Sequence, residues 1–220
     1  MGQYYRACVL NKERDKVLHF VDSWTYGSGC KLMEHSYMRN KFVRAVVGFV
    51  YLNGGANLVW AGDYGDQHIP GEGDEMLNYY EASGQGSEIT VIPGEDVDDM
   101  RYLVNHDKKE YLDLWNVPSV DGWEIHPLPL LCADGNGRGG GDYEGTGMKY
   151  VGSWSGDFIT VETDFDPGEE YKEIKPNFIE FGSLCRELQH IAKYLDGEDI
   201  PDYYRETLKE SAKSIEEVLG

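Results

Sequence analysis

The chain has 220 residues, of which 40 are acidic and 20 are basic, so its net charge at pH 7 is −20. This length supports one hydrophobic core, and so negative a charge excludes direct binding of DNA or RNA as the expected activity. The sequence contains no apolar run long enough to cross a membrane, and its first residues lack the pattern of a secretory signal. We therefore expect a cytoplasmic α+β protein that binds neither nucleic acid nor membranes.

Short apolar runs with a period of two dominate residues 1–165 and predict a mixed, mostly antiparallel sheet. The expected strands span residues 4–10, 17–21, 57–63, 88–93, 100–105, 110–114, 123–132, 148–154 and 158–163. Because Pro127 and Pro129 interrupt the segment 123–132, it is expected to be an edge strand at best.

Helical periodicity is strongest in three segments. Asn40 is the predicted N-cap of a helix that ends near residue 52, with Phe42, Val46, Phe49 and Val50 on one face. One helical turn is expected around residues 75–82, and two C-terminal helices are expected at 183–196 and 202–219. The sequence thus predicts a sheet-rich domain over residues 1–165, packed by the internal helix, and a helical segment over 176–220 on or beside it.

The distribution of charge is more informative than its sum. Residues 1–44 carry a net charge of +4, whereas residues 45–100 contain eleven acidic side chains and no Lys or Arg. Such a segment attracts a basic protein surface, although acidic surfaces also simply keep proteins soluble. The residues predicted to contact a partner are the acids of this segment and two neighbouring aromatic anchors: Glu72, Asp74, Glu75, Tyr79, Tyr80, Glu95, Asp96, Asp98 and Asp99.

A metal site is predicted from residue types. Asp63, Asp66 and His68 are close in the sequence, and His35 lies upstream. Carboxylates and imidazoles are ligands of Zn²⁺, so these four residues are the candidate zinc ligands. The alternative is a solvated loop with a capping aspartate.

The glycine-rich segment 134–142 starts like a calcium loop, but Arg138 stands where a ligand is needed, so it fails the EF-hand pattern. Its backbone could instead form a nest for an anion, or it is a tight turn between strands. No pattern ties a histidine to Cys132 or Ser155, so no nucleophilic enzyme and no catalytic residue are predicted.

Two segments repeat one pattern. Trp60 and Trp154 are each followed by a small residue, glycine and aspartate, which suggests two equivalent strand ends or chance similarity.

Five motifs together resemble a family of phage, prophage and bacterial proteins that has no established activity. They are MGQYY at 1–5, KLMEHSY at 31–37, WAGDYGD at 60–66, the glycine loop at 133–143 and VGSWSGD at 151–157. The resemblance covers most of residues 1–160 and implies a mobile-element setting. In that setting, small and very acidic proteins often resemble counter-defence inhibitors, including anti-CRISPR proteins that bind the Cas9 nuclease.

Charge and resemblance together predict a phage inhibitor that binds a basic surface of a host nuclease such as Cas9 and blocks nucleic-acid loading. The first alternative is a metal-stabilised interaction module. The second is a metal-dependent enzyme acting on a nucleotide, which the charge of −20 disfavours unless a metal offsets it locally.

Overall fold

The computed structural model describes residues 1–182 except 72, 74 and 121. In this part of the chain, nine strands form one sheet. They are β1 (Tyr5–Leu10), β2 (Val17–Val21), β3 (Ala56–Gly62), β6 (Ser87–Glu88), β7 (Tyr102–Asn105), β8 (Glu110–Asp113), β11 (Ala133–Asp134), β12 (Phe158–Glu162) and β13 (Lys172–Glu173).

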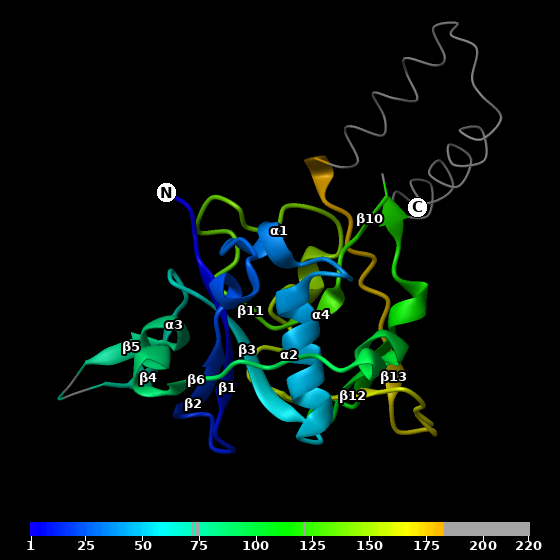
Figure 1. The fold of residues 1–220 in the computed structure, drawn as a ribbon, viewed down its shortest axis with the longest axis horizontal. Helices are drawn as coiled ribbons and strands as arrows, with labels where there is room; N and C mark the ends of the chain where they lie inside the picture. The colour runs from blue at the N-terminus through cyan, green and yellow to red at the C-terminus, as the bar shows by residue number, and fades with distance from the viewer. Residues whose placement is uncertain (72, 74, 121, 183–220) are drawn as a thin grey trace, which may run out of the picture.

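The order of the strands across this sheet is β13-β8-β7-β12-β3-β1-β2-β6, and β11 pairs with β3 beside that path. The longer pairings are antiparallel, whereas the two-residue strands β6, β11 and β13 pair in parallel with β2, β3 and β8. The predicted α+β class with a mixed, mostly antiparallel sheet is confirmed (Figure 1).

The predicted internal helix is α2 (Lys41–Leu52), which lies against one face of the sheet (Figure 1). It begins where predicted because Asn40 Oδ1 accepts hydrogen bonds from the backbone N–H groups of Phe42 and Val43, at 2.9 and 3.3 Å. It ends where Gly54 and Gly55 adopt positive φ angles. Its buried face joins the main hydrophobic core of the described residues, together with Trp60 of β3.

The opposite face of the sheet is covered by α3 (Tyr79–Ala82) and by the hairpin of β4 (Gln67–Pro70) and β5 (Met76–Asn78). Successive side chains point to opposite faces of a strand. In β3, therefore, Leu58 and Trp60 belong to the core under α2, whereas Val59 and Ala61 belong to the smaller cluster under α3.

The predicted edge strand at 123–132 is wrong for most of its length. β10 (Trp123–Glu124) pairs with β9 (Ser119–Val120), but α4 (Pro127–Leu131) is a short helix. The prolines occupy its first turn, where a backbone N–H has no partner within the helix. His126 caps it, because Nδ1 accepts a 3.2 Å hydrogen bond from Leu128 N–H.

Two further strand predictions are wrong. Residues 148–154 form a 3₁₀ turn, η5 (Met148–Tyr150), and further turns at which Gly147 and Gly152 have positive φ angles. In the segment 88–93, only Glu88 belongs to a strand. The two Trp motifs are also not equivalent strand ends, because Trp60 lies within β3 whereas Trp154 lies in the turn before β12, although both side chains are fully buried.

Past residue 165, where the predicted sheet-rich domain ends, the chain stays packed on the same domain. β13 pairs with β8, and Ile174 and Phe178 belong to the main core. The remaining α-helix of the described part is α1 (Leu32–His35). The predicted C-terminal helices lie outside the described residues. Among the helices that are described, none is long and apolar enough to cross a membrane.

Candidate functional site

His35, one of the four predicted metal ligands, is a core residue. Its side chain is fully buried, and both ring nitrogens have partners inside the protein. Nε2 accepts a 2.8 Å hydrogen bond from the indole N–H of Trp60, and Nδ1 donates to the carbonyl oxygen of Gly29 at 2.9 Å. The assignment of His35 as a ligand is therefore corrected, because neither nitrogen has a lone pair free for a metal.

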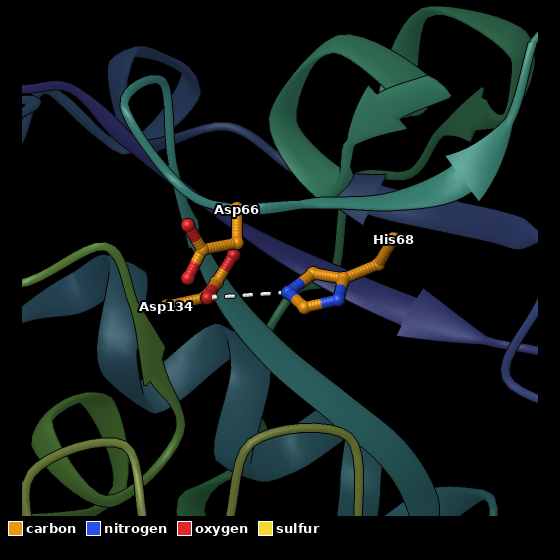
Figure 2. Close-up of side chains that lie close together, drawn as sticks. All are labelled: Asp66, His68 and Asp134. Atoms are coloured by element: carbon orange, nitrogen blue, oxygen red, sulfur yellow. Dashed lines mark ion pairs between the residues drawn. The ribbon is translucent and has the colours of Figure 1, made fainter. Parts of the chain in front are cut away.

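The structure brings Asp66 and His68 together with a residue absent from the predicted set. Ligand atoms of Asp66, His68 and Asp134 all lie within 4.8 Å of one another. Figure 2 shows the two carboxylates side by side, facing the His68 ring. Asp63 is not part of this group, and its Oδ1 accepts a 3.0 Å hydrogen bond from the backbone N–H of Tyr4.

Sheet pairing explains how Asp134 reaches the cluster. β11 runs parallel to the end of β3, with Asp134 opposite Ala61, and the chain then turns from β3 through residues 63–66 into β4. Residues that are 66 or more positions apart in the sequence are thereby placed beside one another. No local pattern could have indicated this, since the pairing joins only two residues of β11.

The three side chains are held by different contacts. The Nε2 atom of His68 lies 3.7 Å from Asp134 Oδ1, and its ring stacks on Tyr79 with centroids 4.9 Å apart. Arg138 binds Asp66 through two hydrogen bonds of 2.7 Å each and donates a third, of 2.9 Å, to the carbonyl oxygen of Tyr64. Arg138 thus places a positive charge at the edge of the cluster.

The pKa values of the two carboxyl groups, Asp66 and Asp134, are shifted in opposite directions. Burial raises the pKa of Asp134, with the neighbouring charge of Asp66 adding to the rise. Its Oδ2 atom is buried and has no hydrogen-bond partner within the described residues. The hydrogen bonds from Arg138 lower the pKa of the exposed Asp66. The cluster therefore combines one buried, poorly satisfied carboxylate with one exposed, paired carboxylate.

The glycine loop after β11 does form a backbone nest, but its own aspartate fills it. Oδ2 of Asp142 accepts hydrogen bonds from the N–H groups of Gly137, Arg138 and Gly139, at 2.7, 2.8 and 2.9 Å. Oδ1 accepts another, of 2.9 Å, from the Tyr5 hydroxyl. The three N–H groups of the nest are therefore occupied by the loop's own carboxylate rather than by an external anion.

Gln3 lies beside this loop as a buried residue with unpaired polar atoms. Its side chain is fully buried, and neither Nε2 nor Oε1 has a hydrogen-bond partner among the described residues. Glycines leave the space that this amide occupies. A Cβ atom added to Gly62 would lie 2.1 Å from Nε2, and one added to Gly135 would lie 2.6 Å from the same atom. Buried amides normally have partners, so this amide needs a ligand or water.

The predicted partner-binding acids fall on two separate parts of the molecule. Glu75 is exposed on the β4–β5 hairpin, which projects at the left of Figure 1. Asp98 and Asp99 are exposed on η3 (Glu95–Asp99), which packs against α2, and Asp98 forms a 2.9 Å ion pair with Arg44. Glu72, Asp74 and the side chains of Glu95 and Asp96 lie outside the described part.

The two predicted aromatic anchors are half-buried. Tyr79 stacks on His68, and Tyr80 lies under the guanidinium of Arg6, 4.5 Å from its carbon Cζ to the ring centroid. Both rings therefore pack against side chains of this protein itself.

A cleft of about 560 Å³ opens elsewhere, beside α2 and η3. Its charges cancel, because Arg39 and Arg44 face Asp98 and Glu124.

Cys132 is fully buried, and burial raises its thiol pKa well above the ordinary value, so it is not an activated nucleophile.

Sequence reasoning found Asp66 and His68 but missed Asp134 and Arg138, although the glycine loop that carries them was recognised.

The resemblance to phage proteins stays a prediction. Comparison of the chain with protein-family models, with curated proteins and with solved structures found no match in any of the three.

Proposed function

We propose that this protein works by binding a basic surface of a partner protein. The partner that fits the charge and the resemblance is a nucleic-acid-guided nuclease of a bacterial host, such as Cas9. The protein would act in the cytoplasm of that host by occupying the groove in which the nuclease loads nucleic acid. The proposal assigns it no catalytic residue.

The observation that carries the proposal is the placement of unneutralised acids. Residues 45–100 contain no Lys or Arg, and Glu75, Glu81, Glu88, Asp98 and Asp99 in this segment are exposed. Of these five, only Asp98 has an ion-pair partner within the described residues. An excess of exposed negative charge raises the rate of encounter with an oppositely charged groove.

The spread of these acids over several elements refines the expected mode of binding. Glu75 lies on the β4–β5 hairpin, Glu81 and Glu88 lie on α3 and β6, and Asp98 and Asp99 lie on η3 beside α2. Each exposed charge contributes little alone, so the affinity depends on how many acids face the basic groove together.

The test is a cleavage assay with a purified Cas9-type nuclease, in which the protein is added before or after guide RNA and target DNA. The proposal predicts inhibition when the protein is added first and much weaker inhibition after loading. A variant in which Glu72, Asp74, Glu75, Glu95, Asp96, Asp98 and Asp99 become Asn or Gln should lose inhibition.

The matched control neutralises seven acids outside residues 45–100, all of them exposed: Glu13, Glu124, Glu144, Asp164, Asp166, Glu169 and Glu170. This control changes the net charge by the same amount and should inhibit better than the first variant. Absence of inhibition by the wild type with every nuclease tested, or equal inhibition by both variants, contradicts the proposal.

The second candidate is an interaction module stabilised by a metal ion. The observation that favours it is the cluster of Asp66, His68 and Asp134. Such a module needs no nuclease partner, and its metal-binding step can be tested separately.

A further inference from the structure

We propose that Asp66, His68 and Asp134 form a zinc site and that Arg138 takes the place of the ion when the site is empty. This inference is independent of the proposed nuclease partner, because it concerns a ligand held by the protein itself. It also replaces the ligand set expected from the sequence, since His35 is committed to the core.

Ligand-type atoms of three residues converge at one place. The three residues come from two chain segments, the turn that leads into β4 and the two-residue strand β11, and their ligand atoms lie within 4.8 Å of one another (Figure 2). Asp66 and His68 are exposed, whereas Asp134 is largely buried. His68, and Asp66 once Arg138 releases it, can close on an ion that the largely buried Asp134 carboxylate anchors.

Two polar side chains at this place have buried atoms that are unsatisfied. Among the described residues, the fully buried Gln3 amide has no partner for either polar atom, and Oδ2 of Asp134 has none either. A Cβ atom on Gly62 would meet both Nε2 of Gln3, at 2.1 Å, and the carbonyl oxygen of Asp134, at 2.7 Å, so the amide lies against the residue that anchors the cluster. A hydrated cation supplies positive charge to the carboxylate and water to the amide.

The donor set selects the ion. One imidazole nitrogen and two carboxylate oxygens suit Zn²⁺, whereas Mg²⁺ and Ca²⁺ prefer sites built wholly of oxygen. Three protein ligands leave a fourth position for water.

Arg138 occupies Asp66 when no ion is bound. Its guanidinium donates to both oxygens of Asp66, so a cation that binds Asp66 must displace it. Its backbone is fixed independently, because the Arg138 N–H donates to Asp142. Removing only the side chain should leave the loop intact, release Asp66 and remove a repelling charge. Arg138→Gln should therefore tighten zinc binding, which is the reverse of what loss of a structural residue does.

The experiment is calorimetric titration of the full chain with ZnCl₂, after treatment with a chelator and its removal, with MgCl₂ as a comparison. Wild type should bind one zinc ion at this site and show a rise in Tm on binding. Asp134→Asn and His68→Asn should each weaken binding by about tenfold or more. Gln3→Met, which replaces an unpartnered amide with a side chain of similar length, should weaken it less. Arg138→Gln should strengthen it.

Glu75→Gln is the matched control, because it neutralises an exposed acid of the same hairpin that is not part of the cluster. It should bind zinc like the wild type. Because the buried Oδ2 atom of Asp134 has no partner in the described part of the chain, Asp134→Asn should fold, and an unchanged circular dichroism spectrum confirms this for each variant. Cys30→Ser should leave binding unchanged, which excludes thiolate ligation by the partly exposed Cys30.

Three results would each overturn the inference. The first is no stoichiometric zinc binding to the wild type. The second is binding that Asp134→Asn and His68→Asn leave unchanged. The third is an Arg138→Gln variant that binds zinc more weakly than the wild type while remaining folded.

Discussion

The indole N–H of Trp60 donates a 2.8 Å hydrogen bond to Nε2 of His35, deep in the core under α2. Because Nδ1 carries the proton that is donated to Gly29, the imidazole is held in one neutral tautomer. A second proton on Nε2 would point directly at the indole N–H. Burial accordingly lowers the pKa of His35 from 6.5 to about 4, against a smaller opposing effect of the Gly29 hydrogen bond.

This relationship predicts a loss of stability in acid. In the unfolded chain His35 takes up a proton below pH 6.5, whereas in the folded protein it does so only near pH 4. The unfolded state therefore binds more protons in this window, and the free energy of unfolding falls as pH is lowered through it. At pH 4, the preferential protonation of His35 in the unfolded chain should lower the free energy of unfolding by about 3 kcal/mol.

The measurement is urea unfolding of wild type and His35→Gln between pH 7 and pH 4. Acidic side chains also titrate here, so the informative quantity is the difference between the two proteins. Wild type should lose about 2–3 kcal/mol more than the variant. Parallel stability curves would show that His35 is not kept neutral by the fold.

A second prediction concerns the carboxylate of Asp142, which accepts three backbone N–H groups and the Tyr5 hydroxyl. Asp142→Ala removes four hydrogen bonds to a charged group and should cost about 3 kcal/mol, allowing for relaxation of the exposed part of the loop. Asp166→Ala is the control, since Asp166 caps only the exposed Gly168 N–H and should cost under about 1 kcal/mol. Equal unfolding free energies for the two variants would refute the role of Asp142 as the centre of the loop.

A third prediction uses two glycines with different surroundings. In Gly62→Ala the new Cβ would lie 2.1 Å from Gln3 Nε2 and 2.7 Å from the backbone oxygen of Asp134, so the end of β3 must shift. Overpacking of this kind costs about 1–3 kcal/mol. In Gly84→Ala the Cβ meets nothing within 4 Å, and stability should stay the same or rise by up to about 1 kcal/mol. Thermal unfolding of both variants checks this, and a Gly62→Ala variant as stable as Gly84→Ala would show that the contacts around Gln3 are loose.

The sequence predicted the elements whose signals are local. The Asn40 cap, the apolar stripe of α2 and the short apolar runs of β1 and β3 depend on residues a few positions apart, and the structure agrees with them. α4 was missed because two prolines normally disfavour regular structure, although in a first helical turn they remove only N–H groups that have no helical partner. The strand expected at 148–154 failed because glycines with positive φ angles turn the chain there.

The candidate site depends on long-range pairing, so the sequence could provide only part of it. Asp66 and His68 were recognisable by type and spacing. Asp134 joins them only because β11 pairs with β3, and His35 leaves them because Trp60 and Gly29 bind both of its nitrogens. Residue spacing indicates neither the pairing of β11 with β3 nor the two hydrogen bonds of His35.

The most direct test of the proposed function is the salt dependence of the association rate between this protein and a Cas9-type nuclease without guide RNA. Electrostatic steering by the acids of residues 45–100 predicts fast association at low salt that slows steeply as ionic strength rises. The variant with seven of these acids neutralised should associate slowly at all salt concentrations, whereas the control variant neutralised elsewhere should keep most of the salt dependence. Association that is undetectable in wild type, or equally fast in both variants across the salt range, would contradict the account.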